Sequence, residues 1–191
     1  MATAVESTGI RWKKAKWVDI MAPKQFNEKK VGETFAKDVD KMLGTTVVVS
    51  VGNLTSNIKK QNLLVTLRLT KFEGEKAKTE IEALSLEKSY VSKLVRKGIS
   101  KIQDSFLVHT KDGKKARVKP LIITLNQVSG SVAAALHHKQ REAIKAYAAQ
   151  HNFVDLLSEV FNFRIQNALK SEFDKIHPVR QFQILHIGLS K

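Results

Sequence analysis

The chain of 191 residues contains no cysteine, which excludes disulfides, thiolate zinc sites, iron–sulfur clusters and a cysteine nucleophile. It has only three prolines, and its longest apolar runs fall far short of the ~20 residues that a membrane-spanning helix requires. The first ten residues have neither a basic start nor an apolar stretch, so we expect no signal peptide. Together these features predict a soluble intracellular protein with no membrane partner.

Sequence motifs for nucleotide binding and catalysis are also missing. The sequence contains neither G-x-G-x-x-G nor G-x-x-x-x-G-K-[ST], and it has no G-x-S-x-G elbow. His137 and His138 are adjacent, so on a helix they point about 100° apart and cannot bind one metal together. Glu80 and Glu82 alternate with apolar residues, as the solvent face of a strand does. We therefore expect no catalytic residues, no metal and no cofactor.

What the chain does have is positive charge. There are 33 lysines and arginines against 18 acidic residues, which gives a net charge of +15, whereas solubility requires a magnitude of only about 2–8. The excess is +5 in residues 1–60, +7 in residues 61–129 and +3 in residues 130–191. A basic excess over the whole chain favours a polyanion that contacts several faces, and nucleic acid is the leading candidate.

Hydrophobic periodicity predicts an α+β fold with a mostly antiparallel sheet. Asp112-Gly113 lies between two β-rich runs and predicts a hairpin turn, and Pro120 predicts an edge or a bulge in the return strand. In residues 63–70, Leu63, Val65 and Leu67 predict the buried face of a strand. The other expected strands are 45–51, 79–85 and 179–189, with a turn at 52–57, and the expected helices are 86–97, 131–150, 153–170 and a short one at 171–177.

The stretch 11–34, "RWKKAKWVDIMAPKQFNEKKVGET", combines two tryptophans with seven basic residues. Aromatic rings stack on bases and cations neutralise phosphates, so this stretch is a candidate for contact with RNA. The alternative is a tryptophan-anchored arm on the protein's own core with solvated lysines. The candidate residues are Arg11, Trp12, Lys13, Lys14, Lys16, Lys24, Lys29 and Lys30.

Strand alternation in "WVDIM" places Trp17 on one side, with Asp19 and Met21, and Val18 on the other, with Ile20. The pattern does not say which side is buried. From the size of the indole ring we expect that Trp17 anchors the fold and that Trp12 contacts RNA.

Two further basic clusters are candidates for RNA contact. One is the hairpin, where Lys111, Lys114, Lys115, Arg117 and Lys119 follow the tip and the return strand; the alternative is a solvated tip. The other is the helix 131–150, where Arg141 and Lys145 line up at i and i+4. A surface helix turns a charged face to water in any case.

The N-terminal stretch "KKAKWVDIMAPKQFNEKKVGET" resembles the signature of the S-three-a family of small-subunit ribosomal proteins, found in archaea and eukaryotes. The similarity extends through "TKDG" and "QREAIK" to "KIHPVRQFQI", which is similar to the family's I-x-P-(L/V)-R ending. The short segment before Trp12, with its Glu6, and the ending after the last expected strand are similar to archaeal-type members. The signature residues are Lys13, Lys14, Lys16, Trp17, Asp19, Ala22, Pro23, Phe26, Asn27, Gly32 and Thr34.

This resemblance implies a structural, non-catalytic component of the small ribosomal subunit, on its platform near the mRNA exit and the 3′ end of the rRNA. It implies a β-barrel-like sheet with packed helices, a basic N-terminal arm at 1–16 and a single rRNA-binding domain at 17–191. The implied partners are small-subunit rRNA and neighbouring platform ribosomal proteins, with mRNA near the exit and initiation factors as further candidates, in the cytoplasm. A free-standing RNA- or DNA-binding protein of chaperone or chromatin type, or a nuclease-like enzyme, remains the alternative.

Overall fold

The computed structural model describes residues 16–36, 42–73 and 75–190. These residues belong to two compact units. Unit 1 comprises residues up to Thr45 together with Leu69–Glu80, and unit 2 comprises Thr46–Arg68 together with the chain from Ile81 onward. The described residues include nine strands and five α-helices, so the expected α+β class is confirmed.

Unit 1 is built on strands β1 (Lys16–Met21) and β2 (Lys30–Ala36), which pair antiparallel. Strand β1 also pairs parallel with the start of β5 (Lys76–Leu86), which follows β4 (Leu63–Glu73) in the chain. The 3-10 turn Lys24–Phe26 connects β1 to β2 and buries the ring of Phe26. Val18 and Ile20 are also buried, so the apolar side of β1 faces the interior of this unit.

Unit 2 contains most of the strands of the nine-stranded sheet. Strand β3 (Thr46–Ser50) pairs with β4, while β5 pairs with β9 (Val179–Leu189). Strand β8 (Lys115–Thr124) lies between β9 and the shorter strands β6 (Lys101–Gln103) and β7 (Phe106–His109). In neither unit does the order of the described strands return to its start, so the barrel-like closure that we expected is not confirmed.

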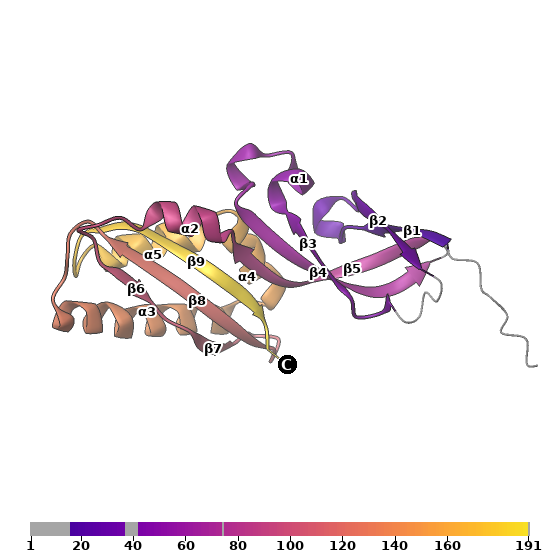
Figure 1. Cartoon of the computed structure of the whole chain (residues 1–191). Helices are drawn as coiled ribbons and strands as arrows, with labels where there is room; N and C mark the ends of the chain where they lie inside the picture. The colour runs from indigo at the N-terminus through magenta and orange to yellow at the C-terminus, as the bar shows by residue number, and fades with distance from the viewer. Residues whose placement is uncertain (1–15, 37–41, 74, 191) are drawn as a thin grey trace, which may run out of the picture. The chain divides into compact units, whose positions relative to one another are not determined.

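The α-helices of the described chain all lie in unit 2. Helix α3 (Gly130–Gln150) lies beside β6 and β7, α5 (Arg164–Phe173) packs on β9, and α4 (Phe153–Phe161) contacts α5 (Figure 1). The two short helices are α1 (Val51–Thr55) and α2 (Lys88–Leu94). The core between helices and sheet is formed by fully buried side chains, among them Leu121, Ile122, Leu136, Leu157, Phe173 and Ile187.

The expected continuous helix 153–170 is wrong, because the chain breaks it at Asn162–Phe163. Phe163 has φ +56°, a left-handed conformation that ends one helix and begins the next. The apolar stripe nevertheless runs through both helices, since Leu156 and Val160 on α4 and Ile165 on α5 are all buried. Helix α5 extends to Phe173 and so includes the beginning of the short helix that was expected at 171–177.

The segment 52–57, expected as a turn, lies largely in helix α1, which begins at Val51 and ends at Thr55. Ser50 caps it, because its Oγ accepts a hydrogen bond from the backbone N–H of Gly52 at 3.2 Å. The next residue, Ser56, is left-handed. A helix of five residues is too short to show a helical period in the sequence.

Pro120 marks a bulge and not an edge. Lys119 lies opposite His186 on β9 and Pro120 lies opposite Ile184, so Leu185 is an extra residue in β9. Such an insertion disrupts the ladder locally, which is where a residue without an N–H can be accommodated.

Candidate nucleic-acid interface

The expected hairpin is present, and its tip is closed by backbone hydrogen bonds. The N–H of Thr110 donates to the carbonyl of Lys114 at 3.1 Å, and the N–H of Gly113 donates to the carbonyl of Thr110 at 2.9 Å. Gly113 has φ +72°, which a residue without a side chain adopts at no steric cost. The hairpin prediction from Asp112-Gly113 is therefore confirmed.

The hairpin tip is also fixed to the segment between α3 and α4. The N–H of Lys111 donates to the carbonyl of His151 at 3.1 Å. The carboxylate of Asp112 accepts a hydrogen bond from the backbone N–H of Phe153 at 3.2 Å, at the first residue of α4. These bonds hold the tip on the body of unit 2, so its cations are presented from a defined position.

Strand β8 places its basic residues on one face. Lys115 and Arg117 are exposed and Lys119 is half-buried, whereas the alternating residues Ala116 and Val118 are buried against the core. The pleat of the strand thus separates a cationic face from an apolar one. Lys111 and Lys114, at the tip, are exposed as well.

We use "hairpin face" for Lys111, Lys114, Lys115, Arg117 and Lys119. Among the residues that the structure describes, these cations have no acidic partner. These groups are therefore available to an external anion, which is what contact with phosphates requires.

His186 borders the hairpin face on the neighbouring strand β9, directly opposite Lys119. Burial of its ring lowers the pKa of His186 below the ordinary value, and the nearby charges of Lys119 and Arg117 lower it further. The ring is therefore neutral at neutral pH. The sequence did not identify this residue, because its position depends on the pairing of β8 with β9.

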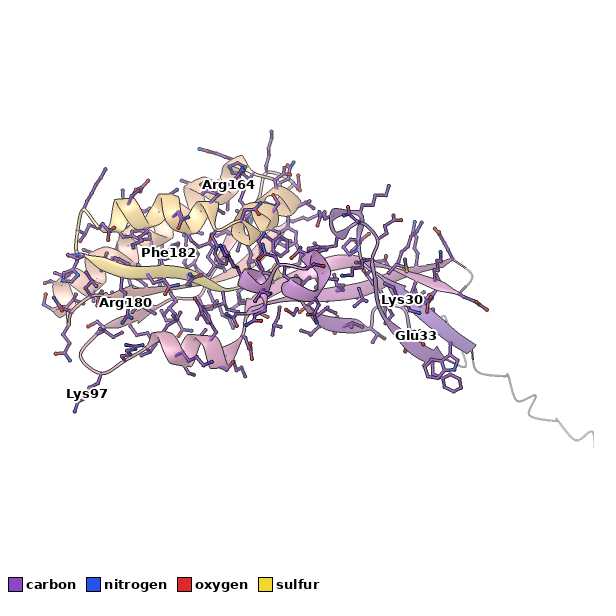
Figure 2. All side chains as sticks on the ribbon, turned by 90° about the horizontal axis from the view of Figure 1, so that it is seen from above. Lys30, Glu33, Lys97, Arg164, Arg180 and Phe182 are labelled. Atoms are coloured by element: carbon purple, nitrogen blue, oxygen red, sulfur yellow. The ribbon has the colours of Figure 1, made fainter. Side chains whose placement is uncertain are left out.

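The candidates in the opening stretch divide into three groups. Arg11, Trp12, Lys13 and Lys14 lie outside the described residues, and Lys16 begins β1. Lys24 and Lys29 are exposed. Lys30 forms ion pairs with Asp19, at 2.8 Å, and with Glu33. Figure 2 labels Lys30 and Glu33. Two hydrogen bonds raise the pKa of Lys30: the one to Asp19 has the larger effect and the one to Glu33 the smaller. The positive charge of Lys30 is therefore already compensated within the protein.

Of the two candidates on helix α3, Arg141 and Lys145, Arg141 is likewise paired with a carboxylate. Arg141 binds the carboxylate of Asp104 with two guanidinium nitrogens, and its Nη2 lies 3.0 Å from Asp104 Oδ1. Asp104 precedes β7, so this pair fastens α3 to the sheet. Lys145 is exposed, and within the described ranges its side chain forms no ion pair.

The Asp104–Arg141 pair makes a prediction about acid stability. The hydrogen bond from Arg141 holds the pKa of Asp104 below its ordinary value. Because the folded-state pKa of Asp104 is depressed, its carboxylate stabilises the fold at pH values above the unfolded-state pKa of about 4. This stabilisation is lost as the pH falls through the folded-state pKa. Asp104→Asn should therefore lower the melting temperature at neutral pH, and the difference from the parent should shrink below about pH 4. Thermal melts of both proteins from about pH 7 to pH 3 check this; a constant difference would contradict it.

Trp17 was expected to be buried, and that expectation is wrong. Trp17 is 63% exposed and Val18 is 1% exposed, so the other side of β1 faces the core. The indole ring lies against the ring of Phe35, which is opposite it on β2 and 56% exposed, with 5.1 Å between centroids. The sequence did not identify Phe35, because only the register of β1 and β2 makes it a partner of Trp17.

The structure offers no metal site or membrane span in the part of the chain that it describes. Among those residues, no group of three or more histidine, aspartate or glutamate side chains could hold a metal ion. In the same residues, no helix is long and apolar enough to cross a membrane.

Comparison with known proteins gives one consistent result. The model of the Ribosomal S3Ae family matches residues 6–191. A relative from Nanoarchaeum equitans is 33% identical over 178 residues, covering 91% of this chain and 90% of the relative. One from Archaeoglobus fulgidus is 31% identical and one from Haloarcula marismortui is 28% identical, covering 94% and 93% of this chain and 86% and 84% of the relatives. All three are named small ribosomal subunit protein eS1. The chain therefore belongs to the Ribosomal S3Ae family.

Proposed function

We infer that this chain is a structural constituent of the small ribosomal subunit and binds small-subunit rRNA. The observation that carries this inference is the family match along nearly the full chain, together with archaeal relatives named as small-subunit proteins. The role is structural and not catalytic, as is that of ribosomal proteins of this family. A place on the ribosome, in the cytoplasm, follows from the same relationship.

The hairpin face supplies the physical mechanism of RNA binding. Cations without acidic partners replace the counterions that surround folded RNA, and the release of these ions favours binding. Lys30 and Arg141 already lie against carboxylates. They therefore contribute less to RNA binding than the hairpin face does. Lys24, Lys29 and Lys145 add further cations, and so do Arg11, Lys13, Lys14 and Lys16 in the N-terminal segment.

The exposed rings of Trp17 and Phe35 in unit 1 supply a second kind of contact. Aromatic faces accept unstacked bases with little sequence preference. The cluster of Asp19, Lys30 and Glu33 lies on the same two strands. We propose that this aromatic pair stacks on an unpaired base or on a ribose, and that Trp12 does the same from the N-terminal segment.

The resemblance to the family supports a more specific placement, which is part of the proposal. The chain would lie on the platform, near the mRNA exit and the 3′ end of the rRNA, beside neighbouring platform proteins. Messenger RNA and initiation factors would approach the same region. Residues 1–16 would act as a basic arm and residues 17–191 as a single rRNA-binding domain.

The salt dependence of binding tests the proposal. The logarithm of affinity for small-subunit rRNA fragments should fall linearly with the logarithm of salt concentration, by about 0.9 for each duplex phosphate neutralised and about 0.7 for each single-stranded one. The five cations of the hairpin face predict a steep slope. A titration of the full chain by fluorescence anisotropy measures it. Binding that is nearly independent of salt would contradict the proposed mechanism.

A further inference from the structure

His186 lies between two cations on one side of the sheet in unit 2. It is directly opposite Lys119 in the pairing of β8 with β9, which run side by side (Figure 1). Two residues further along β9, Gly188 is opposite Arg117. Side chains two residues apart lie on the same side of a strand, and directly opposed residues share a side of the sheet. His186, Lys119 and Arg117 therefore lie on the same side.

The other side of the same two strands faces the helices. Val118 and Ile187 are each 1% exposed, and they line one small cavity with Leu156 and Val160 of α4. His186 alternates with Ile187 and is only half-buried. The side that carries the histidine and the two cations is therefore the solvent-facing side of this part of the sheet.

Gly188 makes room for the His186 ring. A Cβ atom at this glycine would lie 3.0 Å from His186 Nε2 and 2.8 Å from the Cβ atom of Ala83 on β5. The imidazole therefore extends along β9 over Gly188. Since Gly188 is opposite Arg117, the Nε2 end of the ring lies beside the backbone position that faces Arg117.

The polar atoms at this place are unpaired and accessible. Neither ring nitrogen of His186 has a hydrogen-bond partner among the described residues, and both reach solvent. In the same ranges, Lys119 and Arg117 form no ion pair. One histidine and two cations thus converge without an anion that the described chain supplies.

The neighbouring strand β5 brings no charge to the ring. Its residue opposite His186 is Ser85. Glu82 alternates onto the other side of β5 and pairs with an arginine of β4 at 3.9 Å. Glu87, beyond the end of β5, accepts a hydrogen bond from a serine of α2 at 2.7 Å. Within β9 the other charged residue is Arg180, near the start of the strand. The charges that act on the ring are therefore those of the two flanking cations on β8.

This arrangement suits a phosphate. Burial of the ring, followed by the charges of Lys119 and Arg117, lowers the pKa of His186, so the free protein holds a neutral imidazole beside two uncompensated cations. An oxyanion bound to these cations would cancel their repulsion and favour a third positive charge. The several oxygens of a phosphate can accept hydrogen bonds from more than one cationic donor.

We propose that His186, Lys119 and Arg117 together bind one backbone phosphate of RNA, and that His186 takes up a proton from solvent when the phosphate binds. The imidazolium then donates a hydrogen bond to the phosphate. The proposal rests on the proposed RNA-binding function and adds a proton that this function by itself does not require. Because binding favours the protonated ring, affinity should rise as the pH falls from the bound-state titration midpoint of His186 toward its free-state midpoint.

Proton uptake on binding tests the proposal. Isothermal titration calorimetry of the full chain with a small-subunit rRNA fragment, in two non-phosphate buffers of different ionisation enthalpy at about pH 6.5, counts the protons taken up. The parent should take up more protons than His186→Gln, by roughly one at most. His138→Gln is the matched control, because His138 is exposed on α3, outside this sheet, and its variant should match the parent. From about pH 7.5 to about pH 5.5 at fixed ionic strength, affinity should rise about three- to tenfold more for the parent than for His186→Gln.

Each outcome decides the proposal. Equal proton uptake by the parent and His186→Gln would overturn the phosphate site and leave the RNA-binding function intact. Polyglutamate is the second probe, and an equally large uptake that depends on His186 would assign the site to an acidic protein instead. If the parent does not bind the rRNA fragment at low salt, the RNA-binding function itself fails.

Thermal melts show whether the variants fold. If His186→Gln does not, the imidazole NMR signals of the parent still decide. The titration midpoint of His186 should rise when the rRNA fragment binds, and an unchanged midpoint would overturn the proposal.

Discussion

Replacing Lys114, Lys115 and Arg117 together with glutamine is expected to reduce the salt slope of rRNA binding by about 3, one for each phosphate that these cations no longer neutralise. The three side chains are exposed, and no carboxylate forms an ion pair with them among the described residues. Phosphate contacts carry no sequence information, so affinity should fall by nearly the same factor for unrelated RNA fragments. Affinities of two such fragments at several salt concentrations measure both effects. Incorporation of the variant into small subunits should weaken in parallel.

A charge-matched control separates specific contact from general attraction. Replacing Lys30, Lys78 and Lys139 with glutamine lowers the net charge by the same three units, from +15 to +12. Each of these lysines forms an ion pair with a carboxylate, so its removal should change the slope much less. Equal slopes in the hairpin variant and the parent would show that the tip is merely solvated. Thermal melts must come first, although the hairpin variant keeps Asp112 and Gly113, which set the turn.

The second large expected effect is on the free energy of unfolding, and it distinguishes the buried side of β1 from the exposed side. Ile20 is 5% exposed, and Ile20→Ala should lower the free energy of unfolding by about 2–5 kcal/mol through the cavity that it leaves. Trp17→Ala removes a larger side chain but only a cross-strand contact with Phe35, which is worth about 0.2–1 kcal/mol. The smaller residue should therefore have the larger effect on stability. Denaturant melts of both variants measure this.

RNA binding should respond in the opposite order. Trp17→Ala should weaken binding to small-subunit rRNA by about 1–3 kcal/mol, the value of one stacked base, and Phe35→Ala should do so to a smaller extent. Ile20→Ala should leave affinity unchanged wherever the protein is folded. A Trp17→Ala protein that melts as early as Ile20→Ala, or that binds RNA like the parent, would show that this aromatic pair is structural.

The outcome for β1 shows what periodicity can and cannot predict. In β4, Leu63, Val65 and Leu67 are buried as expected, because the other side of that strand is mostly polar and so the pattern favours one side clearly. In β1, apolar residues occur on both sides, so the alternation was correct and the choice of side was not. Size alone favoured Trp17 for the core, but the described fold of unit 1 places Val18 and Ile20 there.

The remaining differences come from interactions between residues that are distant in the sequence. Arg141 resembles a solvated cation until the fold brings it to Asp104, 37 residues away. Gln166 and Gln183 resemble surface residues, and only the packing of α5 on β9 buries them. Phe163 carries no sequence signal for a left-handed conformation. The hairpin face could be predicted, in contrast, because its turn and its charges are local.

Association with the small ribosomal subunit is tested most directly by sucrose-gradient fractionation of cells that contain this protein. We predict that the chain migrates with small subunits in a ratio of about one to one and is released as salt is raised, since phosphate contacts weaken with salt. A free-standing RNA- or DNA-binding protein would instead spread over ribosome-free fractions or follow DNA. Recovery of the chain mainly in fractions without small subunits, at low salt, would contradict a structural role in the ribosome.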